Sequence, residues 1–365
     1  MRTKNFICKK VGLLVWVLET HPSEIEKILG KQEALNISIL KDTANRHKLL
    51  LTPEIYAVVK IESSLLKGAR KYFEENNFTE VVVPHITKAT GACENIATMF
   101  ELDYFGQRAY LSQTGQLYLE VLTPLLGKVW CTIQSFRAEP LADERHLAEF
   151  TLVELEFAGN FEELLKHIEG VICSMINCTL IERERELQLL KVDIERLKRI
   201  RKPFQRITYT EAVGLLAEYG VQWGDDLKSQ HEKMLVQMHG NQPLFVTHFP
   251  KAIKFFNMRE NDENPAVVNS ADLLLPLSGE AVGAAEREYR YEKLYERLIN
   301  SMMFKQLVAK GGSIEDFRWY LEFYKEQRPI HSGCGIGLNR VTQFVLGTND
   351  IRATTAFPLN KESIL

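Results

Sequence analysis

The chain has 365 residues, of which 45% are hydrophobic and 25% charged, a composition typical of a globular protein with one large domain or two smaller ones. A formal net charge of −3 creates no overall field that would attract nucleic acid, so any such binding must be local. Six scattered cysteines without a C-x-x-C pair exclude a small disulfide framework and favour reduced thiols in a cytoplasmic protein.

Residues 1–50 form a short N-terminal segment of unknown role. Lys9 and Lys10 precede an apolar run at 11–18, but Glu19 ends that run and no small-residue cleavage site follows. We therefore expect a buried strand there rather than a targeting segment. No other stretch approaches the length of a membrane span, so no contact with a membrane is expected.

The pattern becomes regular from residue 53 onward. Proline is favoured in the first turn of a helix, and apolar residues recur at helical spacing from Ile55 to Phe73, which predicts a helix. The run FTEVVVPHIT (78–87) predicts a strand that Pro84 closes. Further strands are predicted at 108–113, 128–139 and 149–159.

The strand at 149–159 has two chemically different faces. One face carries Phe150, Leu152, Glu154 and Glu156, whereas the alternate positions 151, 153, 155 and 157 are mostly apolar. This alternation is typical of a sheet with one packed side and one side that lines a cleft.

The rest of the chain mixes helices with strands. Residues 161–200 are predicted to be helical, and the glycine-rich stretch 330–347 to run from a strand into a helix. Other helices are expected at 209–219 and 286–309, and strands at 243–250 and 271–277. Strands in hairpin-like succession among helices predict an α+β fold with a largely antiparallel sheet.

Paired charges surround the predicted hairpin loop at 140–148. Guanidinium groups bind phosphates bidentately and stay charged, so arginines at both ends of the loop could clamp a polyphosphate. A carboxylate beside them can accept from an exocyclic amine, and an aromatic ring can stack on a base. The predicted ATP-binding residues here are Arg137, Glu139, Arg145, His146 and Phe150.

Two carboxylates flank a turn in the segment 271–290. Strand pairing would bring Asp272 and Glu280 close together, and Mg²⁺ usually takes one or two carboxylates plus substrate oxygens. The small residues that follow Glu280 would let a ligand approach the backbone.

The segment GCGIGLNR (333–340) is a third candidate. It does not fit the dinucleotide fingerprint, because its glycines alternate along a strand and so clear one face. That cleared face would admit a flat ring, and Arg340 at the start of the following helix could reach the phosphates of the same ligand.

Together these segments resemble the signature motifs of class II aminoacyl-tRNA synthetases. FRAE, RHLAEF and ELE are similar to the second motif, and GCGIGLNR to the third. The resemblance spans roughly residues 55–358 and is greatest to the asparaginyl subgroup of the aspartyl/asparaginyl branch. It implies an antiparallel sheet flanked by helices, a catalytic domain over 51–365, and a homodimer with Pro84 at the interface.

The resemblance also implies a role for each motif residue. Arg137 would contact the α-phosphate, Glu139 the adenine amine, Arg145 and His146 the γ-phosphate end, Phe150 and Arg340 the two faces of adenine, and Asp272 and Glu280 a Mg²⁺ ion. An amino-acid carboxylate would attack the α-phosphorus and pyrophosphate would leave, so catalysis would rest on positioning and charge, with Arg137, Arg340 and Glu280 as catalytic residues.

The substrate expected from this resemblance is asparagine. Leu119 stands where aspartyl enzymes carry a lysine, and Glu120 follows it as in asparaginyl enzymes. A carboxylate there could accept from a side-chain amide and would repel aspartate, while Arg287 would donate to the amide oxygen. The expected amino-acid site comprises Gln113, Gln116, Glu120, Glu154 and Arg287.

Four features depart from the family pattern. The loop is PLADE (140–144), Asn339 replaces an acidic residue, Glu286 would add a negative charge beside the pocket, and residues 1–50 are too short for the usual anticodon-binding β-barrel. These departures favour a stand-alone paralogue that activates asparagine, or aspartate, and passes it to an acceptor other than or in addition to tRNA, in an amide-forming reaction like that of asparagine synthetase.

Two alternatives stay open. The first is an asparaginyl-tRNA synthetase that charges tRNA, and the second is a non-catalytic regulatory module that kept the fold. Retention of the motif residues ranks the second alternative last.

Overall fold

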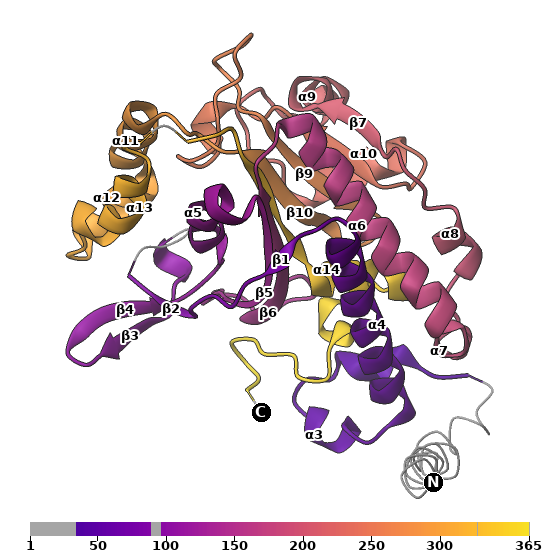
Figure 1. Cartoon of the computed structure of the whole chain (residues 1–365). Helices are drawn as coiled ribbons and strands as arrows, with labels where there is room; N and C mark the ends of the chain where they lie inside the picture. Colours follow the sequence, from indigo (N-terminus) through magenta and orange to yellow (C-terminus); the bar gives the residue numbers. More distant parts are fainter. Residues whose placement is uncertain (1–33, 89–95, 327, 365) are drawn as a thin grey trace, which may run out of the picture.

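The computed structural model describes residues 34–88, 96–326 and 328–364 (Figure 1). The predictions for the run 11–18 and for the cysteines at 8 and 93 lie outside these residues. The described chain builds a large sheet that is flanked by helices, as the sequence predicted.

Eight strands form this sheet, in the order β1-β5-β6-β11-β10-β9-β8-β7. From β5 to β8 all neighbours are antiparallel, whereas the edge strands β1 and β7 each pair in parallel. The strands are β1 (Thr79–Glu80), β5 (Lys128–Phe136), β6 (Glu149–Phe157), β7 (Gln205–Thr208), β8 (Leu244–Thr247), β9 (Ser270–Leu275), β10 (Gly279–Glu286) and β11 (Ser332–Gly337).

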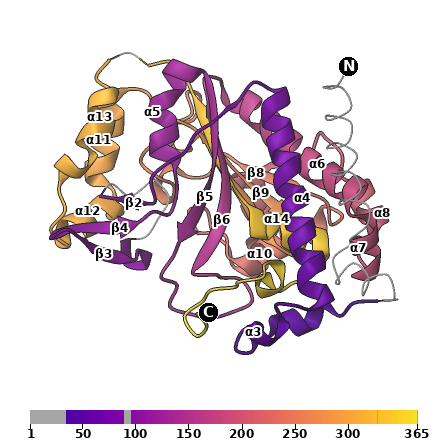
Figure 2. The ribbon, with the colours of Figure 1, turned by 60° about the horizontal axis from the view of Figure 1, so that its bottom comes forward.

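Helices α4 (Pro53–Glu75), α6 (Phe161–Glu182) and α14 (Leu338–Leu346) cover one face of the sheet (Figure 2). The Thr52 side chain caps α4 in front of a proline, and a capping box starts α6. The apolar positions of β6, namely Val153, Leu155 and Phe157, pack under these helices in the largest core cluster.

The two long helices approach each other closely at Gly68. A Cβ atom at this position would lie 2.6 Å from the Cα of Met175, so a side chain cannot be accommodated at the crossing. Among the described residues α6 alone is long and apolar enough to span a membrane, which the sequence expectation overlooked. Just over half of its apolar window is buried in the protein (56%), which marks it as a core helix.

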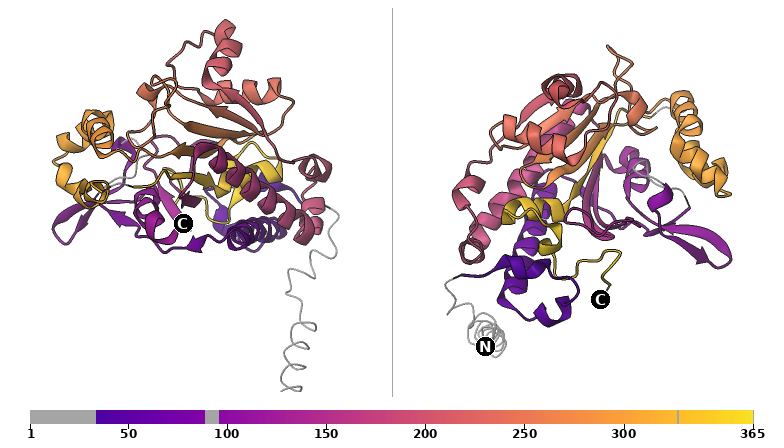
Figure 3. Two further views of the ribbon diagram at one scale, coloured as in Figure 1. Left: turned by 45° about the horizontal axis from the view of Figure 1, so that its top comes forward. Right: turned by 180° about the vertical axis from the view of Figure 1, so that it is seen from behind.

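A smaller layer lies on the opposite side of the sheet (Figure 3). Helix α5 (Gln116–Leu126) packs on β5 and β6, beside a three-stranded sheet formed by β2 (Ile86–Thr87), β3 (Glu101–Tyr104) and β4 (Gln107–Leu111). The segment α11 (Tyr291–Asn300), α12 (Met302–Ala309), η5 (Ile314–Phe317) and α13 (Arg318–Phe323) forms a helical insert that has its own apolar core.

Short elements complete the described chain. They are η1 (Ile37–Lys41), α3 (Arg46–Leu49), η2 (Ile96–Thr98), α7 (Glu184–Leu189), α8 (Ile194–Lys198), α9 (Tyr209–Leu216), η3 (Ala217–Tyr219), α10 (Ser229–Met238), η4 (Lys251–Ile253) and η6 (Ile351–Thr354).

Two element predictions were wrong in detail. The strand predicted at 78–87 is two short strands that join different sheets, because the chain leaves β1 before Pro84. Residues 279–286 form strand β10, whereas the sequence suggested a turn followed by a helix from 286. The alanines and glycines of β10 concealed it, since such residues are poor in strand-forming side chains.

Candidate functional site

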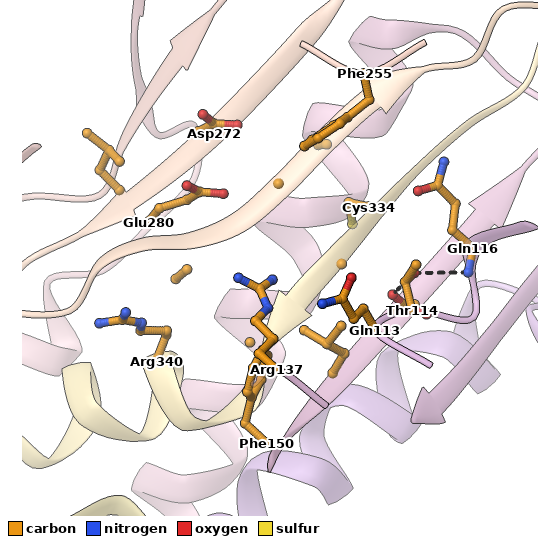
Figure 4. A pocket seen from close by; sticks show the side chains of 18 of the residues that line it. Gln113, Thr114, Gln116, Arg137, Phe150, Phe255, Asp272, Glu280, Cys334 and Arg340 are labelled. Carbon is orange, nitrogen blue, oxygen red and sulfur yellow. Dashed lines mark hydrogen bonds between the residues drawn. The ribbon is translucent and has the colours of Figure 1, made fainter. Parts of the chain in front are cut away.

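A cavity of about 730 Å³ opens on the face of the sheet opposite α4 and α6 (Figure 4). It is lined by all but one of the predicted site residues: Gln113, Gln116, Arg137, Glu139, Arg145, His146, Phe150, Glu154, Asp272, Glu280, Arg287 and Arg340. The exception is Glu120. Residues more than 200 positions apart in the sequence therefore meet here because strands β6, β9, β10 and β11 are neighbours.

The floor of the cavity is a row of paired residues across four strands. Glu154 pairs with Gly335, Gly335 with Gly283, and Gly283 with Asp272. Directly paired residues project from the same face of a sheet, so two glycines separate a carboxylate at either end. The alternate glycines thus clear the cavity face of β11.

A β-bulge in β10 places Glu280 on this same face. Glu280 pairs with Leu274 and Val282 with Leu273, so Ala281 is an extra residue. Without the bulge, strand alternation would point Glu280 toward the helices. With it, Glu280 and Asp272 both project into the cavity (Figure 4).

The cationic end of the cavity is built around the hairpin loop between β5 and β6. The Asp143 carboxylate accepts hydrogen bonds from the backbone N–H groups of Arg145 and His146, at 2.8 and 2.9 Å. Asp143, a residue of the atypical PLADE loop, therefore holds the backbone at Arg145 and His146, where the chain turns back toward β6. The Arg137 guanidinium lies 5.1 Å from the centre of the Phe150 ring, in cation–π geometry.

Arg340 joins this end from α14. Its Nη1 donates to the Ser278 carbonyl at 2.8 Å and its Nη2 to the Arg145 carbonyl at 2.7 Å. Burial, with a smaller effect of Arg145, lowers the pKa of Arg340 to about 10, so the side chain stays charged at neutral pH. Glu232 of α10, which the sequence analysis missed, lies 3.3 Å from Arg145.

The acidic side of the cavity contains a lysine that was also missed. Lys254 Nζ donates to both carboxylate oxygens of Asp272, at 2.9 and 2.7 Å. Reduced hydration within the cavity, together with the charge of Asp272, raises the pKa of Glu280 above its usual range even though Lys254 acts in the opposite direction, and the side chain itself stays open to solvent. The segment FPKAIK (249–254), which carries Lys254, contains no motif that would have marked this lysine.

The opposite end of the cavity is narrower and rich in hydrogen bonds. Glu154 is buried and accepts from the Gly115 N–H at 2.6 Å and from the Thr114 hydroxyl. Burial raises its pKa to about 7 despite these donors. Gln113 and Gln116, on either side of Thr114, complete the wall (Figure 4).

A buried ion pair closes this end. Arg287 donates to Glu156 Oε1 from Nε at 3.0 Å and from Nη2 at 2.5 Å, and both side chains line the cavity. The second oxygen of Glu156 has no hydrogen-bond partner among the described residues. Gly333 makes room for this carboxylate, because a Cβ there would lie 2.0 Å from Glu156 Cδ.

Glu120 lies one layer behind the cavity surface and is fully buried. Its Oε1 accepts from Gln116 Nε2 at 2.7 Å and from Asn257 Nδ2 at 3.1 Å, and Arg287 Nε is 3.8 Å away. The predicted residue is thus in the expected neighbourhood, but it meets two residues of the cavity wall rather than the cavity itself.

Glu286 does not add charge to the cavity, contrary to the sequence analysis. It pairs with Ser332, which faces the helix layer, and its carboxylate binds Arg259 and accepts from the Phe161 N–H at the start of α6. Asn339 does line the cavity, and its amide is held there: Nδ2 donates to the Thr354 hydroxyl and Oδ1 accepts from the Thr151 N–H.

Comparisons with known proteins agree with this geometry. The family model for tRNA synthetases class II (D, K and N) matches residues 40–361. Asparagine–tRNA ligases from Pelotomaculum thermopropionicum and Thermococcus kodakarensis are each 39% identical to the chain over 86% of its length and 71% of theirs.

The chain is also similar to solved structures of asparaginyl-tRNA synthetases. Asparaginyl-tRNA synthetase from Pyrococcus horikoshii, complexed with asparaginyl-adenylate, superposes with a TM-score of 0.81 at 36% identity, over 90% of this chain and 74% of that one. The enzyme from Entamoeba histolytica, also with asparaginyl-adenylate, gives 0.76 at 30% identity, over 88% and 71% of the two chains.

Proposed function

Because the chain belongs to the class II aminoacyl-tRNA synthetases of the D, K and N group, we propose that it is an ATP-dependent ligase that activates asparagine as asparaginyl-adenylate and transfers it to tRNA. The observation that carries the proposal is that one cavity contains three regions in a row. Arginines line one end, glycines leave the floor clear in the middle, and side chains that form hydrogen bonds line the other end. A nucleotide and an amino acid could lie end to end across it.

The reaction needs charge and positioning rather than a protein nucleophile. Arg137 would bind the α-phosphate and stabilise the charge that develops when the substrate carboxylate attacks phosphorus. Arg145, His146 and Arg340 surround the space toward which pyrophosphate would leave. Glu139 would accept from the adenine amine, and Phe150 would stack on the base.

Asp272 and Glu280 fit a divalent cation such as Mg²⁺. Both carboxylates project into the cavity, and Lys254 donates to Asp272 but not to Glu280, whose oxygens stay open to a cation. A bound ion would supply positive charge to the phosphate oxygens of ATP.

Asparagine is supported over aspartate by the charges around the side-chain end. Glu120, Glu154 and Glu156 surround Arg287, so an additional substrate carboxylate would meet excess negative charge. An amide could instead accept from Arg287 and donate to the unpartnered oxygen of Glu156.

Transfer to tRNA is better supported than the non-tRNA acceptor that the sequence analysis favoured. The relatives are named as asparagine–tRNA ligases, and Glu286 no longer marks an altered pocket. Of the N-terminal segment 1–50, the structure describes residues 34–50.

We further propose one catalytic domain over 51–365, a homodimer and a cytoplasmic location. Large apolar side chains are exposed on the segment after β1 and at the end of α5, where Val82 is 97% and Leu125 79% exposed, and these elements pack on one another. Such a surface suits a subunit interface. The described cysteines are free thiols, as expected in a reducing compartment.

ATP–pyrophosphate exchange over a panel of amino acids tests the activation step. Exchange should require asparagine, and exchange with aspartate alone would refute the substrate assignment. Charging of total tRNA should then follow, whereas formation of product with ammonia or hydroxylamine but not with tRNA would favour the amide-forming alternative. Absence of exchange with every amino acid would favour the non-catalytic module.

A further inference from the structure

Helix α13 of the insert reaches the amino-acid end of the cavity from behind. The hydroxyls of Tyr320 and Tyr324 donate to Glu120 Oε2 at 2.7 and 2.6 Å. Both tyrosines belong to the core of the insert, and α13 packs against α5, which carries Glu120. The insert is thus tied to the cavity by two hydrogen bonds to one carboxylate.

These bonds leave Glu120 with every oxygen engaged. Oε1 is held by Gln116 and Asn257, Oε2 by the two tyrosines, and His331 Nε2 lies 3.6 Å from Oε2. His331 also contacts the Tyr324 hydroxyl, at 2.9 Å. A fully buried carboxylate needs this many donors to remain ionised and in one orientation.

The tyrosines can act on the substrate only through Glu120. Neither tyrosine lines the cavity, whereas Gln116 and Arg287, the neighbours of Oε1, do. If Oε2 lost its donors, the Glu120 carboxylate could rotate or take up a proton. Gln116 and Arg287 would then no longer face a negatively charged oxygen in a fixed position.

We propose that Tyr320 and Tyr324 are positioning residues that fix the ionised carboxylate of Glu120 behind Gln116 and Arg287, and thereby make the site select a side-chain amide over a carboxylate. The proposal rests on the proposed activation of asparagine. It assigns to the helical insert a part in amino-acid selection, exerted from outside the cavity.

The test compares Tyr320→Phe, Tyr324→Phe and the double variant with the wild type in ATP–pyrophosphate exchange, with asparagine and with aspartate. Phenylalanine keeps the packing and removes the hydroxyl, which in Tyr320 bonds Glu120 and in Tyr324 bonds Glu120 and also contacts His331. The double variant should raise KM for asparagine about tenfold or more and lower the asparagine-to-aspartate ratio of kcat/KM by a similar factor, with KM for ATP unchanged. Tyr295→Phe, on α11 of the same insert, is the matched control and should change none of these values.

A double-mutant cycle with Glu120→Gln separates positioning from a general structural effect. The tyrosine substitutions should have little further effect on the ratio in the Glu120→Gln background, because the charge that they hold is absent. Equal effects in both backgrounds, or an unchanged ratio in the double variant, would overturn the proposal while leaving asparagine activation intact. Failure of the wild type to exchange asparagine would overturn both.

Discussion

Replacing Gly333 by alanine should displace the carboxylate of Glu156 from Arg287. The new Cβ would lie 2.0 Å from Glu156 Cδ and 2.1 Å from Oε1, where ordinary contact begins near 3.4 Å, so the carboxylate must move by more than an ångström. It cannot do so and keep its bonds of 3.0 and 2.5 Å to Arg287. Breaking a buried pair costs about 3 kcal/mol or more, which corresponds to a fall in melting temperature of roughly 4 °C in a chain of this size.

Gly335→Ala is the matched control for this effect. A Cβ there would lie 3.5 Å from its nearest neighbour, Glu154 Oε1, which is ordinary contact, so stability should change by less than about 0.5 kcal/mol. Thermal unfolding of both variants measures the difference. Gly333→Ala should also raise KM for asparagine, whereas Gly335→Ala, on the floor, should raise KM for ATP. Equal melting temperatures in the two variants would refute this account of the glycines.

Three further predictions concern other parts of the molecule. Arg137→Ala should reduce ATP–pyrophosphate exchange at least about 100-fold at near wild-type stability, and near-normal exchange would show that the phosphate clamp is misassigned. Burial lowers the pKa of His167 to about 4, so on acidification the unfolded chain takes up this proton before the folded chain does. The free energy of unfolding should therefore fall as the pH drops from about 6.5 to about 4. The loss should be about 2 kcal/mol after allowance for partial exposure. Urea unfolding of His167→Phe should show a weaker pH dependence over that window, and an undiminished slope would exclude His167 as its source. Lys254→Met should lower the melting temperature because Asp272 would remain buried without its cation, and Mg²⁺ should restore part of the loss. Stability that does not respond to Mg²⁺ would argue against Asp272 and Glu280 as metal ligands.

Much of the site could be predicted because its residues occur in short motifs with strand periodicity. The alternation in β6 assigned Glu154 to the open face and Val153 to the core, and the structure confirms both. The hairpin between β5 and β6 was confirmed for the same reason, since its two flanking strands are long and regular.

The contacts that sequence could not reveal are those made between distant segments without a motif. Lys254 meets Asp272, and Tyr320 meets Glu120 from an insert 200 positions away in the chain. Glu286 was misplaced for a related reason: a residue beside a motif takes its face from the local strand register, and the register of β10 contains a bulge. A strand made largely of glycine and alanine gives little pattern from which that bulge could be inferred.

Because Ala281 is an extra residue in β10, the face of the sheet on which Glu280 lies depends on how many residues separate Glu280 from Gly283. Removing Ala281 would restore regular alternation and leave Glu280 opposite Leu274 on the open side, whereas removing two residues would turn its carboxylate into the apolar layer beneath α14 and α6. Among viable descendants of this sequence, a deletion between Glu280 and Gly283 should therefore remove one residue rather than two.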